Sequence, residues 1–113
     1  MTLAEFHQAL QIALSQHFPQ AKVVITESRG IILSCKAELG FDAFIAVYFN
    51  ALTGKTSYAL IQAGQRVTGY DNYKFWHYHP LGTPDQHTPC AQPTPEEAMT
   101  QLAAASKQLG IYS

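Results

Sequence analysis

Four strand-like runs follow one another between residues 22 and 63, and this succession constrains the fold more than any other feature. The runs cover residues 22–27, 31–38, 41–50 and 55–63, and the first two are rich in β-branched side chains. The turns between them, Ser28-Arg29-Gly30 and residues 51–54, have the length and chemistry of antiparallel connections. With a short fifth run at residues 66–70, the pattern predicts an antiparallel sheet of four or five strands.

Helices are predicted on both sides of these runs. Residues 2–18 begin with the capping box of Thr2 and Glu5, carry apolar side chains at helical spacing, and end before Pro19. A last helix starts at Thr94, with Glu97 closing a second capping box, and stops at Gly110. The expected fold is α+β, a single domain over residues 1–113 with the helices covering one face of the sheet.

The charge balance excludes a broad electrostatic surface. Seven Lys and Arg against eight Asp and Glu give a net charge of −1 with neutral histidines, which is no large field for nucleic acid or anionic lipid. Its apolar runs are too short to span a bilayer, so we expect a cytoplasmic protein without a membrane partner. Two cysteines make no disulfide framework; Cys35 is expected to be a buried thiol, and Cys90 a buried thiol or a ligand.

Residues 71–95 hold five of the six prolines, and their apolar residues follow neither helical spacing nor the alternation of a strand. A long loop is therefore expected there. Five aromatic side chains lie within residues 70–78, at the start of this segment, which argues against disorder. Trp76 and Phe75 are expected to anchor the loop to the core.

Three of the five histidines fall in this loop. His77, His79 and His87 precede Cys90 with the spacing H-x-H-x7-H-x2-C. If the segment is extended, His77 and His79 point to the same side. Such a pair can bind a divalent metal, can divide the roles of acid and base, or can simply stack and hydrogen-bond within a rigid loop. The spacing matches none of the strong zinc signatures.

Charged and aromatic residues flank the histidines. Asp71 could orient an imidazole by accepting its ring N–H, or could only steer the chain through a turn with Asn72. Arg66 and Lys74 could hold a phosphate, although exposed basic residues are often merely solvated. Aromatic side chains here could also stack on the bases of a single strand. The candidate substrate-binding residues are Arg66, Lys74, Tyr70, Tyr73 and Tyr78.

The run Tyr70-Asp71-Asn72, the histidines before Pro80, the later histidine and the Pro/Thr/Glu entry into the last helix together resemble the TumE-like family of small toxins from toxin–antitoxin operons. The resemblance implies an N-terminal helix, an antiparallel sheet ending in an aromatic-Asp-Asn turn, and an RNA-directed activity. Family members typically carry adjacent histidines before the proline and a later Pro-His-His-Lys-His cluster, whereas this chain has His77-Tyr78-His79 and a single later histidine. The family's marked positions correspond to Tyr70, Asp71, Asn72, His77, His79 and His87.

Three functions follow as hypotheses. In a ribonuclease without stored metal, His77 or His79 removes the 2′-hydroxyl proton, another histidine protonates the leaving oxygen, and Asp71 orients the base. In a metal-binding module, zinc or another divalent transition metal is held by the three loop histidines, with Cys90 as a further ligand. In an interaction protein, the aromatic loop binds an antitoxin or another partner, or a sheet edge pairs with a second copy to form a homodimer.

Overall fold

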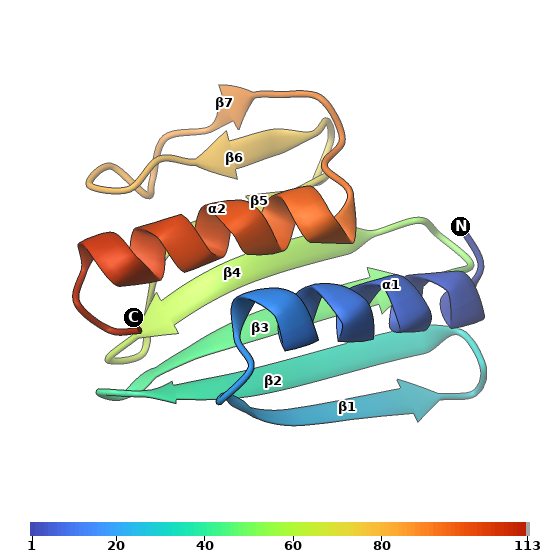
Figure 1. The fold of residues 1–113 in the computed structure, drawn as a ribbon. Helices are drawn as coiled ribbons and strands as arrows, with labels where there is room; N and C mark the ends of the chain where they lie inside the picture. Colours follow the sequence, from blue (N-terminus) through green and yellow to red (C-terminus); the bar gives the residue numbers. More distant parts are fainter. Residues whose placement is uncertain (113) are drawn as a thin grey trace.

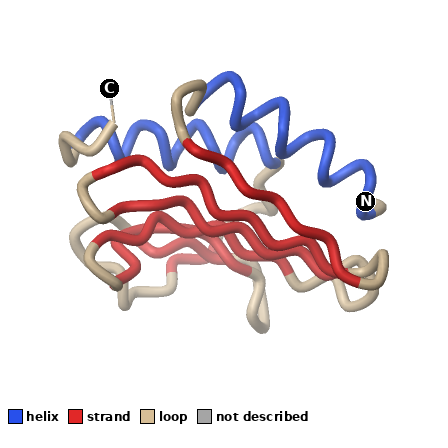
Figure 2. Tube along the Cα trace, turned by 90° about the horizontal axis from the view of Figure 1, so that it is seen from below, coloured by secondary structure: helices blue, strands red, loops and turns tan. Residues whose placement is uncertain are grey.

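The chain folds into two helices and one seven-stranded antiparallel sheet, seen in a computed structural model that describes residues 1–112 (Figure 1). Each strand pairs with the next along the chain, so the sheet order is β1 to β7. Both helices lie on the same face of the sheet (Figure 2). The elements are α1 (Leu3–His17), β1 (Lys22–Ser28), β2 (Ile32–Gly40), β3 (Ala43–Asn50), β4 (Thr56–Gln62), β5 (Gln65–Asp71), β6 (His77–His79), β7 (Thr88–Pro89) and α2 (Pro95–Gln108).

The α+β class with a helix at each end is confirmed. Both predicted capping boxes are present, since Thr2 and Thr94 each accept a hydrogen bond from the backbone N–H three residues later. The core lies between the helices and the sheet, where alternate residues of β2 and β3 are buried. Phe6 of α1 stacks on Phe49 of β3 with ring centroids 4.2 Å apart. Burial of these side chains is the main stabilising term of the fold.

The expected count of four or five strands is wrong, because residues 71–95 are not one structureless loop. The short strands β6 and β7 extend the sheet, and the Oγ1 of Thr68 donates a hydrogen bond to the carbonyl of His79 at 2.7 Å. Strands of three and two residues are too short to establish a period of two, so the sequence pattern gave no signal for them.

The aromatic side chains of this segment divide into two groups. Trp76 packs against the core as expected. The same expectation is wrong for Phe75, which is 48% exposed. Cys35 is buried, which confirms the interpretation of it as a core thiol. Among the described residues, neither helix is long and apolar enough to cross a membrane.

Candidate functional site

The register of β5 and β6 brings the predicted site residues together. Asp71 pairs with His77 and Gly69 pairs with His79, so both imidazoles lie on the face of the sheet opposite the helices. The prediction that His77 and His79 share one side is confirmed. His87, just before β7, lies against both rings, stacking on His77 with centroids 4.5 Å apart and meeting His79 edge-on at 5.0 Å.

Backbone carbonyls fix the proton on one nitrogen of each buried imidazole. The Nδ1 of His77 lies 2.9 Å from the carbonyl oxygen of Phe75, and the Nδ1 of His79 lies 2.7 Å from that of Pro84. Because a carbonyl oxygen only accepts, each Nδ1 must donate. His77 and His79 are 1% and 3% exposed, so these contacts are shielded from water.

The other ring nitrogens converge on a single carboxylate. The Nε2 of His77 is 3.0 Å from Oδ1 of Asp71, and the Nε2 of His79 is 2.9 Å from Oδ2. Burial raises the pKa of Asp71, but hydrogen bonds from His79 and from the backbone N–H of Tyr73, with the nearby histidine charges, outweigh burial and lower that pKa overall. Asp71 is therefore an ionised carboxylate at neutral pH.

The contacts of His79 Nε2 with Arg66 and with Asp71 require opposite protonation states of this nitrogen. Its guanidinium nitrogen lies 2.7 Å from Nε2 of His79 and 3.5 Å from Oδ2 of Asp71. Arginine only donates and an ionised carboxylate only accepts, so Nε2 cannot satisfy both neighbours with one protonation state. A cation or a substrate group that reaches this nitrogen would change the hydrogen bonding among His79, Arg66 and Asp71.

An open pocket lies beside this cluster. It has a volume of about 560 Å³. Arg66, His79 and His87 reach it from the candidate site. Gln65, Pro84 and Asp85 complete its lining and were not predicted from the sequence.

Neither carbonyl partner of the histidines was predicted either, because a main-chain oxygen is positioned by the loop conformation and not by residue type. Asp85 is an acidic residue of the proline-rich loop, and this is the one signal by which the sequence could have included it in the site.

Three of the predicted residues lie elsewhere. Tyr70 and Tyr78 face α2, with ring centroids 5.9 Å apart, and Cys90 lines a second pocket with them. Cys90 is thus on the opposite side of β6 from the imidazoles and does not belong to the group of converging metal-ligand atoms found among the described residues. The alternation that places His77 and His79 on one side puts Tyr78, which lies between them, on the other.

Tyr73 and Lys74 lie in the connection between β5 and β6. Tyr73 is 66% exposed, and the ammonium group of Lys74 lies 5.6 Å from the centre of its ring. The backbone N–H of Tyr73 donates to Asp71, so this connection supports the site through its main chain.

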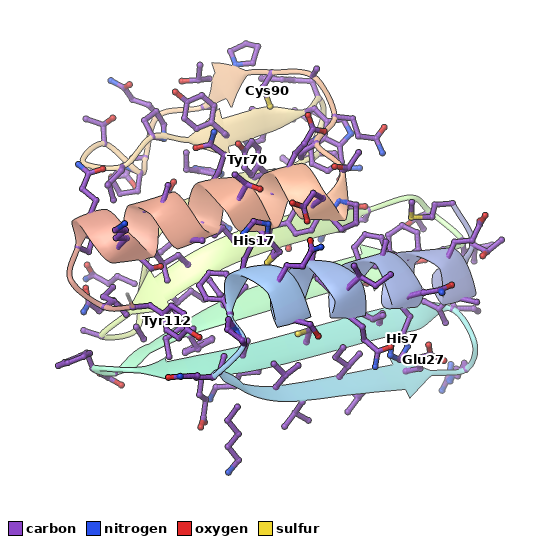
Figure 3. All side chains as sticks on the ribbon, in the orientation of Figure 1. His7, His17, Glu27, Tyr70, Cys90 and Tyr112 are labelled. Atoms are coloured by element: carbon purple, nitrogen blue, oxygen red, sulfur yellow. The ribbon has the colours of Figure 1, made fainter. Side chains whose placement is uncertain are left out.

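The two remaining histidines belong to other parts of the molecule. His7 contacts Glu27 at 2.6 Å, which ties α1 to β1 (Figure 3). His17 contacts Glu96 at 2.7 Å and ties α1 to α2. They serve as matched controls for the clustered histidines.

Comparison with known proteins identifies no relative: no family model, no curated protein and no solved structure matches the chain.

Proposed function

We propose that Asp71, His77, His79 and His87 bind a divalent transition-metal ion, and that this centre acts on the phosphodiester backbone of RNA. The convergence of the two Nε2 atoms on one carboxylate carries the proposal. Ring nitrogens whose opposite N–H groups donate to backbone carbonyls are the usual arrangement of histidine metal ligands. A cation between these atoms would meet lone pairs from both rings and from Asp71.

The spacing of these atoms supports the metal. Two ligand atoms about 2.0–2.1 Å from one ion lie about 2.8–3.4 Å apart at ordinary coordination angles. The distances from Asp71 to the two Nε2 atoms, 3.0 and 2.9 Å, fall in that range. Ligand atoms of the three histidines all lie within 4.8 Å of one another, and Asp71 adjoins the group through its contacts with His77 and His79. Imidazole and carboxylate ligands suit zinc and its neighbours.

Proton transfer by His77 and His79 without a metal is less compatible with this geometry. A general base needs a ring nitrogen that faces the substrate. All four nitrogens of these two rings already face protein groups. A divalent ion would supply the missing chemistry by polarising a phosphoryl oxygen and lowering the pKa of a bound water.

Arg66 supports a phosphate-containing substrate. Its side chain is 40% exposed and lines the open pocket with His87. A guanidinium group can bind two phosphate oxygens at once. RNA as the substrate, and a place in the TumE-like toxins, rest on the resemblance of the Tyr70–Asn72 and histidine motifs.

The metal is tested by elemental analysis and by zinc titration against a chelator. We expect about one ion per chain in the wild type and at least about a tenfold loss of affinity in Asp71→Asn, because a coordinating charge is removed. Asp85→Asn, in the open pocket beside the cluster, is the control and should bind normally. Wild-type protein without bound or titratable metal would refute the site.

The activity is tested separately with single-stranded RNA and added zinc or manganese. His77→Ala should lose cleavage together with metal, whereas Arg66→Ala should keep the metal and lose cleavage. His17→Ala should behave as the wild type. If every preparation that binds metal leaves the RNA intact, the protein is a metal-binding module without nuclease activity.

A second candidate function is binding of a protein partner such as an antitoxin. Tyr73 and Phe75 are 66% and 48% exposed in the β5–β6 connection, and exposed aromatic residues are enriched at interfaces. We expect the product of a neighbouring gene to shift the sedimentation of the wild type but not of a Tyr73→Ser, Phe75→Ser double variant. Equal shifts for both would exclude this surface.

A further inference from the structure

The helix-free face of the sheet continues from the histidine cluster across β4 and β3. Strand register joins Asp71 to Ser57 of β4, and Ser57 to Tyr48 of β3. Directly opposed residues of antiparallel strands lie on the same face. A single row therefore runs from His77 through Asp71 to the ring of Tyr48.

Two aromatic rings lie on this face, each under an ammonium group. The Nζ of Lys55 lies 5.8 Å from the centre of the Tyr48 ring, and the Nζ of Lys36 lies 4.5 Å from that of Phe44. Both rings are half-buried. Phe44 and Tyr48 are four positions apart along β3, a distance of about 13 Å in an extended strand.

The same face carries an excess of positive side chains. Strand register places Lys22, Lys36, Lys55 and Arg66 along it, against Glu38, which contacts Lys36 at 3.8 Å, and Asp71, which lies 3.5 Å from Arg66. The whole chain has a net charge of −1, so this local balance differs from that of the molecule. Aromatic rings interleaved with cations are the elements with which proteins bind single strands.

We propose that this face binds single-stranded RNA, with bases stacked on Tyr48 and Phe44 and the backbone held by the two lysines and Arg66. The inference rests on the proposed function, since the row of residues ends at the proposed metal centre. An RNA strand with a base stacked on Tyr48 of β3 would have only β4 to cross before it reached Asp71 of β5. The lysine side chains would turn from the rings to the phosphates as the bases enter.

A single strand fits these contacts better than a duplex. Stacking needs bases that are not already stacked on both sides, and a duplex offers these only at its ends. Ala46 lies between the two rings along β3 and pairs with Ala59 of β4, so only small side chains occupy the positions between them. Positive charge beside both rings favours the nucleic acid over an apolar protein surface.

Fluorescence anisotropy with a labelled 12-nucleotide RNA of mixed sequence, in EDTA and low salt, tests the proposal. Tyr48→Ser should weaken binding at least about fivefold, since stacking of one base contributes about that factor or more. Tyr48→Phe keeps the ring and should bind as the wild type. Lys36→Gln should also weaken binding, whereas Lys107→Gln, on α2, should not. Duplex RNA of the same length should compete poorly.

Equal binding by Tyr48→Ser and Tyr48→Phe would overturn the inference, as would wild-type protein that binds no single strand. Failure of the metal centre would look different. The wild type would then bind no zinc but would still bind RNA through the sheet face. Failure of the sheet-face inference alone would instead leave zinc binding intact in the wild type and in Tyr48→Ser. A partner protein bound by the wild type and released by Tyr48→Ser, in the absence of RNA binding, would assign this face to protein recognition and also overturn the proposal.

Discussion

Asp71 accepts hydrogen bonds from His79 and from the backbone N–H of Tyr73, and its net pKa is lowered despite burial. A carboxylate whose pKa is lower in the folded state contributes stability above its ordinary pKa and loses it as the pH falls through the lowered value. We therefore predict that, in EDTA, the stability difference between the wild type and Asp71→Asn shrinks as the pH falls from 5 to 3. Urea unfolding at each pH measures this difference. Parallel curves over that range would contradict the prediction.

The two thiols should differ in reactivity. Burial raises the pKa of Cys35 to about 11, and Cys35 is 6% exposed; burial also raises the pKa of Cys90, which is only half-buried. Because the thiolate is the reactive form and must be reached by the reagent, a disulfide reagent at pH 8 should label one thiol in the native protein and two in guanidinium. In Cys90→Ser the native protein should not react. Labelling of both thiols at one rate would contradict this assignment.

The side chains that make up the site were predictable from the sequence, but the hydrogen bonds between them were not. His77 and His79 were placed on one side because the alternation of an extended chain is a local property. The carbonyl oxygens of Phe75 and Pro84 were not predictable, since they are positioned by the path of a proline-rich loop. Arg66 was singled out only for its charge, and its contact with His79 depends on the pairing of β5 with β6.

At the level of elements, Gly69 allows β5 to approach β4 closely enough to present Asp71. A Cβ at this position would overlap the carbonyl oxygen of Tyr58 and would lie 3.0 Å from the Cα of Ala59. We predict that Gly69→Ala destabilises the protein by more than about 2 kcal/mol, because backbone atoms of β4 must move. The same change should weaken zinc binding, since the pairing of Gly69 with His79 is disturbed.

Gly64→Ala is the matched control for this prediction. Gly64 also has a positive φ, 77°, but a Cβ there meets nothing within 4 Å. Its cost should be the conformational one alone, about 1 kcal/mol, without an effect on zinc. Thermal unfolding and zinc titration of the two variants distinguish steric overlap from backbone conformation, and equal losses would rule out the overlap.

The long, regular elements were predictable, whereas the strands that form the site were not. α1 and α2 carry apolar residues at helical spacing over fourteen residues or more, and β1–β4 are runs of at least seven residues separated by recognisable turns, which is enough to identify them. β6 and β7 are held by neighbouring strands and by side-chain contacts such as that between Thr68 and His79. Their conformation is a tertiary property, and local propensity carried no signal for it.

In the molecule as a whole, the core does not depend on the histidine cluster, because the helices and β1–β4 bury their apolar side chains against one another. The segment from Asn72 to Pro93 is different. Besides the short pairings of β6 and β7 and the packing of Trp76 and Leu81 against the core, it is held by polar contacts that converge on the cluster, including those of His77 and His79 with Asp71. A metal ion joining these side chains would stabilise this segment first.

Zinc should therefore raise the thermal stability of the wild type and protect that segment from hydrogen exchange. Free zinc at about 100 times its dissociation constant adds about 2.7 kcal/mol by mass action, an increase of about 10 °C or more in Tm for a chain of this size. EDTA should reverse the shift and speed exchange in peptides from residues 72–93, leaving those from β2 and β3 unchanged. His77→Ala should show neither effect, whereas His7→Ala should show both. Uniform protection along the chain, or an unchanged Tm, would mean that the cluster does not hold this segment through a metal ion.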